Sequence, residues 1–177
     1  HCPRITNVSA LGRVHSLRLF RCHGITDMSA LGSVHTLYLQ FCSRVFTDVS
    51  ALGGVQYLTL QNCYGITDVS ALGSVRTLVL RGCWRIWDMS ALGSVHTLTL
   101  NNCDGIKDVS PLGSVHTLTL HSCGRITDVG ALHSVHTLTV HWCRQITHLD
   151  VTALEYVHSL TYVLAVLRKN GSLKILF

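Results

Sequence analysis

The sequence is short of charge and of proline. Only 13% of its 177 residues are charged, nine are acidic, and proline occurs twice. No apolar run approaches the ~18–20 residues of a transmembrane helix, so we expect no membrane association. The net charge of +5 comes from scattered residues and not from the lysine and arginine runs of a nucleic-acid-binding arm. The sequence therefore predicts neither a membrane nor a nucleic acid as partner.

Residue patterns that would support catalysis are also missing. Serine and histidine are plentiful, but each occupies a position that recurs at regular intervals along the sequence. No unique residue stands out as a nucleophile or base. Glycines are spread singly, so there is no phosphate-binding loop. Cysteine and histidine never converge at a zinc-ligand spacing. We therefore predict no enzyme activity, no cofactor and no metal site.

What the sequence has in abundance is one unit of about 20 residues. Copies begin at Cys2, Cys22, Cys42, Cys63, Cys83, Cys103 and Cys123, and an eighth copy, from Cys143, departs from the pattern. The step is 20 residues except between Cys42 and Cys63, where one extra residue predicts a small bulge in the turn after Cys42. A period of this length predicts a solenoid, in which each coil contacts only its neighbours. We assign residues 1–150 to an array of seven coils and a partial eighth.

Each coil combines one strand with one short turn. In the fifth copy of the strand pattern, apolar and polar residues alternate from Val95 to Leu100, which is the period of a β-strand. Strands that recur in one direction stack into a parallel sheet. Asp108 precedes a segment of only one helical turn, so we expect its carboxylate to accept backbone N–H groups of a 3₁₀ turn. Gly113 then ends the turn, where we expect a positive φ.

Seven residues of each coil are predicted to point inward and form one continuous core. In this copy they are Val95, Leu98, Leu100, Cys103, Ile106, Val109 and Leu112. Because every cysteine occupies the same place in its coil, the eight thiols point the same way and do not converge as a disulfide requires. We expect them to be small buried residues. Unpaired cysteines in this number predict a reducing, intracellular compartment. No signal peptide is visible after His1, but a removed leader, and with it secretion, is left open.

The pattern of valine, two leucines, cysteine, isoleucine, threonine and aspartate resembles a leucine-rich repeat of the cysteine-bearing kind, best known from F-box-type proteins. The compact end of the unit, such as Asp88 to Gly93, looks more like the short repeats of bacterial internalins, which usually carry asparagine in place of the cysteine. The resemblance implies a solenoid with its sheet on the concave side, used to bind protein partners. The expected fold is therefore an α/β solenoid, a right-handed superhelix with a parallel sheet on one face and 3₁₀ turns on the other.

The end of the chain breaks the repeat. Leu154, Val157, Leu160, Leu164 and Leu167 follow helical spacing, which predicts a capping helix from about Thr152 to Lys169 and a final strand over 172–177. The alternative is an eighth repeat strand over 157–162, which copies the earlier strands. We assign 151–177 to this C-terminal cap. The first coil lacks its strand, so either the chain continues an array or the open N-terminal edge pairs with another molecule.

The candidate binding site lies on the outward positions of the strands and just beyond them. In the first four coils several of these positions are basic or aromatic, and none is acidic; tyrosine with arginine is the composition of interface hot spots. They predict a protein partner with an acidic surface. The predicted partner-binding residues are Arg18, Phe20, Arg21, Tyr38, Phe41, Tyr57, Arg76 and Arg81, with His121, His141 and Trp142 from the later coils.

Three alternatives stay open. The predicted partner-binding residues could be ordinary solvent-facing strand residues with no binding role, as the threonines at the same positions of the later coils suggest. The near-identical coils could instead serve a structural role and stack end to end into filaments. A histidine column could sense pH or bind metal, although simple duplication of the repeat is the favoured explanation of the column. That column contains His15, His35, His96, His116 and His136.

Overall fold

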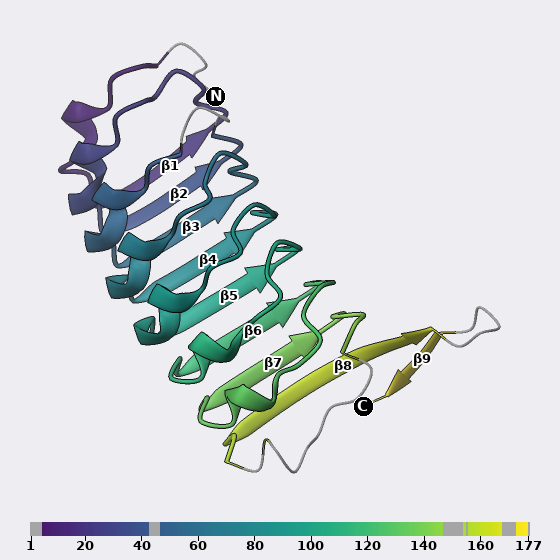
Figure 1. Cartoon of the computed structure of the whole chain (residues 1–177). Helices are drawn as coiled ribbons and strands as arrows, with labels where there is room; N and C mark the ends of the chain where they lie inside the picture. The colour runs from purple at the N-terminus through teal and green to yellow at the C-terminus, as the bar shows by residue number, and fades with distance from the viewer. Residues whose placement is uncertain (1–4, 43–46, 147–153, 155, 168–172, 177) are drawn as a thin grey trace.

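The protein is a single stack of coils (Figure 1). The structure, a computed structural model, describes residues 5–42, 47–146, 154, 156–167 and 173–176. Within these residues the strands form one sheet in the order β1 to β9, so each strand lies beside its neighbour in sequence. The strands β1 to β8 run parallel, and β9 runs antiparallel to β8. The strand-per-coil prediction is therefore confirmed.

The seven repeat strands have five residues each and identical spacing within their coils. They are β1 (Ser16–Phe20), β2 (Thr36–Gln40), β3 (Tyr57–Gln61), β4 (Thr77–Arg81), β5 (Thr97–Asn101), β6 (Thr117–His121) and β7 (Thr137–His141). Between β2 and β3 the register advances by 21 residues, Thr36 pairing with Tyr57, so the extra residue leaves the sheet undisturbed. The bulge predicted for the turn after Cys42 lies in 43–46, outside the described residues.

A short 3₁₀ turn lies on the other side of each coil, as Figure 1 shows. These turns are η1 (Ser9–Leu11), η2 (Ser29–Ser33), η3 (Ser50–Gly54), η4 (Ser70–Ser74), η5 (Ser90–Ser94), η6 (Ser110–Leu112) and η7 (Gly130–Leu132). The predicted role of the aspartates is confirmed. The backbone N–H of Ser110, for example, donates to Asp108 Oδ1 at 2.8 Å. This bond holds each turn at its start.

The core runs without interruption through the stack. All seven inward residues predicted for the fifth strand's coil, from Val95 to Leu112, are at most 2% exposed. No polar or charged side chain is buried among the described residues. Each coil therefore contributes only apolar groups and the cysteine thiol, and the hydrophobic gain comes from stacking one coil on the next.

The glycines that end the turns have a different role from the predicted one. Gly12 and Gly113 have φ of −64° and −58°, which are ordinary right-handed values. A Cβ at Gly53 would instead lie 2.5 Å from the Ala71 carbonyl oxygen of the next coil. At Gly53 the adjacent backbones approach too closely for a side chain, which explains the glycine of this coil. His133, which replaces this glycine once, keeps the same backbone with φ of −59°.

The cysteines form a ladder of thiols along the inside of the stack. Each described thiol from Cys42 to Cys123 donates to a strand carbonyl of the preceding coil; Cys83 Sγ, for example, lies 3.4 Å from Leu60 O. Burial raises the pKa of Cys83 to about 12, and it also raises the pKa of Cys103. From Cys42 to Cys143 the thiols are buried and unlinked, as predicted.

The C-terminal helix predicted over 152–169 is wrong. Residues Ser159–Leu167 form strand β8, which pairs with β7 so that Leu160 lies beside Leu138. Leu173–Leu176 forms β9, within the expected final strand. The alternative, an eighth repeat strand, is confirmed, because the open edge of β7 offers hydrogen bonds that a helix could not use. Across the described residues, no helix has the length and hydropathy of a membrane span.

Candidate functional site

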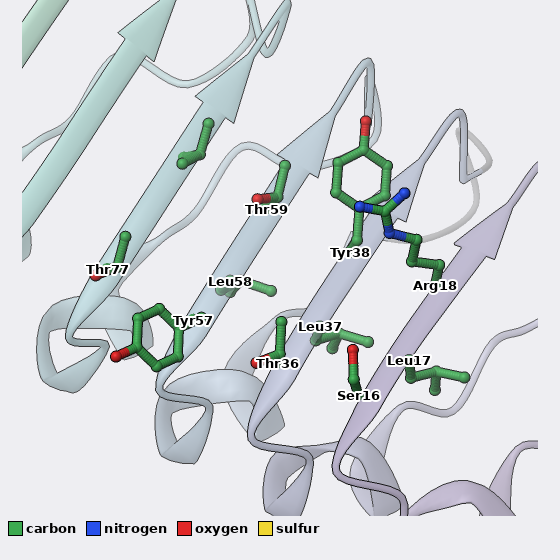
Figure 2. A pocket seen from close by; sticks show the side chains of 11 residues that line it. Ser16, Leu17, Arg18, Thr36, Leu37, Tyr38, Tyr57, Leu58, Thr59 and Thr77 are labelled. Carbon is green, nitrogen blue, oxygen red and sulfur yellow. The ribbon is translucent and has the colours of Figure 1, made fainter.

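The exposed sheet face carries a hollow over its first four strands, β1 to β4. The hollow has a volume of about 240 Å³. Leu17, Leu37 and Leu58 lie along it, and Arg18, Tyr38 and Tyr57 stand around it (Figure 2). Strand alternation puts these three polar-ended side chains outward while the leucines point toward the core. The register places Arg18 beside Tyr38 on adjacent strands.

The polar side chains of the hollow are held by one another. The Arg18 guanidinium carbon lies 5.1 Å from the centroid of the Tyr38 ring, a cation–π distance. The Tyr38 hydroxyl in turn donates to Gln61 Oε1 at the end of β3. Tyr57 is 42% exposed, which is high for a side chain of its size. A partner would therefore meet an arginine that already contacts an aromatic ring.

A second cluster lies just past the ends of β1 and β2. The rings of Phe20 and Phe41 meet edge to face at 5.8 Å. The Arg21 guanidinium carbon lies 5.2 Å from one ring centroid and 5.6 Å from the other. Arg21 is thus held over two aromatic rings while its charge stays accessible, because the residue is exposed.

Sequence reasoning missed the backbone conformation of this cluster. Arg21 and Phe41 both have φ of +51°, and Trp142 has φ of +59°. The corresponding residues Asn62, Gly82, Asn102 and Ser122 share this left-handed conformation. Asparagine and glycine adopt it readily, so their recurrence was the available signal. A bulky phenylalanine or tryptophan there costs free energy, and such residues cluster at functional sites.

The other predicted site residues lie apart from these two groups. Arg76 precedes β4 and Arg81 ends it, so they lie at opposite ends of one strand. His121 and His141 end β6 and β7, with their rings 6.2 Å apart. Four strand spacings of ~4.8 Å put His121 roughly 19 Å from the end of β2. The predicted site therefore separates into the hollow, the Arg21 cluster, the two ends of β4 and a group that ends with Trp142.

The histidine column is a stack of rings along the margin of the sheet. His96, His116, His136 and His158 stack with centroids 4.5–4.7 Å apart, and His15 stacks on His35 at 4.5 Å. Desolvation and the neighbouring His116 and His158 lower the pKa of His136. Within the part of the chain that the structure describes, no group of three histidine, cysteine or acidic residues could hold a metal ion.

Two exposed tryptophans and a half-buried tyrosine beyond the strands were not among the predicted site residues. Trp84 is 53% and Trp87 is 68% exposed, and the Tyr64 ring lies 6.3 Å from the Trp84 ring. The signal that could have found them is a break in the repeat. Trp87 stands where the neighbouring coil has Thr67.

With the fold and these surfaces described, the class of the protein follows: it is a leucine-rich repeat solenoid with cysteine-bearing coils. No protein-family model and no curated protein matches the sequence. Among solved structures, the fold is similar to the internalin InlF of Listeria monocytogenes, with a TM-score of 0.62 and 24% identity. That similarity covers 90% of this chain and 51% of InlF, so the chain spans about half the length of that protein.

Two other solved structures from Listeria monocytogenes are similar to smaller degrees. Internalin C2 has a TM-score of 0.49 and 21% identity, over 84% of this chain and 80% of that protein. The functional domain of InlJ, described as including a cysteine ladder, has a TM-score of 0.48 and 18% identity, over 91% of this chain and 47% of that one. The likeness to InlF supports the leucine-rich repeat fold.

Proposed function

We propose that the chain is a protein-interaction module that binds an acidic protein partner on the exposed sheet face, without catalysis. The observation that carries the proposal is the hollow over β1 to β4, where Arg18 lies against Tyr38 beside the exposed Tyr57. Leucine-rich repeat solenoids present such extended faces to other proteins.

Charge favours an acidic partner. The outward positions of the strands carry Arg18 and Arg81 and no acidic residue, while Asp27 and its equivalents lie on the turns. Arginine binds carboxylates with two parallel hydrogen bonds, and its side chain also stacks on aromatic rings. Because Arg18 and Arg21 are already placed against rings, less side-chain freedom is lost on binding.

A charge reversal tests the proposal. The probe is a set of labelled ten-residue peptides rich in glutamate, in lysine or in serine, titrated at low salt. The glutamate peptide should bind, and the double variant Arg18→Glu, Arg21→Glu should lose that binding. The matched control is the double variant Arg125→Glu, Arg144→Glu, which changes the same charge at exposed residues of later turns and should bind as the wild type does. Equal binding by both variants would refute an acidic partner on this face.

The alternative proposal is a structural one, end-to-end stacking of identical coils. Sheet edges pair readily with other sheet edges, and β1 borders the described sheet. Light scattering over a range of concentrations separates the two proposals, because stacking predicts a mass that rises with concentration. A constant monomer mass removes this alternative and leaves the interaction module. For location we propose a reducing, intracellular compartment, where a ladder of buried free thiols persists.

A further inference from the structure

A column of carboxylates runs along the coils between the turn after each strand and the next 3₁₀ turn. Asp48, Asp68 and Asp88 are exposed, and each accepts a backbone N–H through Oδ1 at 2.8–2.9 Å. These hydrogen bonds lower the pKa of all three groups, so the carboxylates are ionised at neutral pH. The same bonds hold each carboxylate against the start of its 3₁₀ turn.

Two adjacent coils break the threonine column that precedes these aspartates, coil five with Trp87 and coil six with Lys107. Thr47 and Thr67 occupy it in coils three and four, but Trp87 occupies it in coil five. The hollow between Asp48 and Asp68 has a volume of about 280 Å³, whereas the hollow between Asp68 and Asp88, which Trp87 borders, has about 410 Å³. The tryptophan therefore extends a repeated shallow hollow into a larger one.

The chemistry of the larger hollow suits a cation. A tryptophan face attracts ammonium and guanidinium groups, and two ionised carboxylates border the same space. Trp87 is 68% exposed, so its indole is accessible to a partner's side chain. The pKa of Asp68 and of Asp88 is lowered by hydrogen bonds from Ser70 and Ser90, while the neighbouring aspartate of the preceding coil opposes the shift.

We propose that the hollow between Trp87, Asp68 and Asp88 is a binding site for a basic side chain of a protein partner. The lysine or arginine lays its apolar stem against the indole and directs its charge toward the two carboxylates. This site lies on the turns and not on the exposed sheet face, so it is independent of the site for an acidic partner. It gives the module a second surface of opposite charge.

The probes are four tripeptides with blocked ends and glycine on both sides of lysine, arginine, norleucine or glutamate. The readout is the indole N–H resonance of Trp87, assigned by its loss in Trp87→Thr, a variant that restores the residue of the neighbouring coil. We expect saturable shifts with the lysine and arginine peptides and none with the other two. Equal shifts with the norleucine peptide would overturn the proposal, because they would reveal a merely apolar surface.

Variants separate charge from structure. In the double variant Asp68→Asn, Asp88→Asn the amide oxygens still accept the turn N–H groups, but the negative charge is gone, and affinity should fall by about fivefold or more. Lys107→Thr removes a positive charge one coil away and should tighten binding. Unchanged affinity in the asparagine variant, or weaker binding in Lys107→Thr, would contradict the proposal. Arg18→Glu with Arg21→Glu should bind the lysine peptide normally, so the two sites can fail separately.

Discussion

Replacing Gly53 with alanine tests how closely the coils pack. The Cβ of the new residue would lie 2.5 Å from the Ala71 carbonyl oxygen, closer than any real Cβ contact. That oxygen belongs to backbone, so the two coils must separate and strain the sheet ladder. Overpacking of this kind destabilises the folded state by about 1–3 kcal/mol. Replacing glycine also reduces the conformational entropy of the unfolded chain, which stabilises the protein by about 0.4–1 kcal/mol. We expect a net loss of about 1.3 kcal/mol in the free energy of unfolding, the difference between the midpoints of these two ranges.

The assay is urea unfolding followed by circular dichroism, with Gly130→Ala as the matched control. Among the described residues, a Cβ at Gly130 would meet only the Asp128 carboxylate oxygen, at 3.2 Å, so this variant should be as stable as wild type or slightly more stable. Gly113→Ala, with its Cβ 2.8 Å from the Ala131 oxygen, should lose less stability than Gly53→Ala. If Gly53→Ala matched Gly130→Ala, the explanation by backbone contact would be refuted.

Three further predictions concern single side chains. Cys83, whose pKa burial raises to about 12, should resist iodoacetamide at pH 8 in the folded protein and react in urea; rapid folded-state labelling, measured by mass spectrometry, would contradict its burial. Desolvation and the neighbouring rings lower the folded pKa of His136 below 6.5, so protonation favours the unfolded state. The free energy of unfolding measured in urea should be constant above about pH 6.5 and should fall as the pH drops from there toward the lowered pKa. The fall should be smaller in His116→Gln. A rise in stability over the same pH range would show that the folded pKa of His136 is raised and not lowered. The Nε2 atom of the half-buried His141 is shielded from solvent and has no hydrogen-bond partner among the described residues. His141→Leu should therefore raise the thermal midpoint by removing a cost of about 1–3 kcal/mol, and a lower midpoint would disprove that cost.

Much of the fold was predictable because the same inward-pointing apolar positions recur in every copy of the repeat. The alternation through Leu98 and Leu100 gave the strand, and Asp108 marked the start of the 3₁₀ turn. The role of Gly53 was not predictable, because a recurring glycine shows that no side chain fits but not whether φ or a neighbouring backbone is the reason. Only the distance between coils distinguishes the two.

The C-terminal segment illustrates a different limit. Leu160 and Leu164 satisfy a helical spacing, and Leu160 also continues the leucine column of the strands. The local sequence pattern is compatible with both a helix and a strand, but the unpaired edge of β7 favours a strand. The site shows a similar division. Strand register predicts that Arg18 lies near Tyr38, whereas the placement of Arg21 over two rings depends on the positive φ of Arg21 and Phe41.

The central claim is that the hollow over β1 to β4 binds an acidic protein segment. Its most direct test is to titrate the isotope-labelled protein with the glutamate-rich peptide and to map the amide resonances that move. We predict that the largest shifts fall on Arg18, Tyr38 and Tyr57 and that the threonines of β5 to β7 stay unchanged. Shifts spread evenly along the solenoid, or centred on β6 and β7, would contradict the claim.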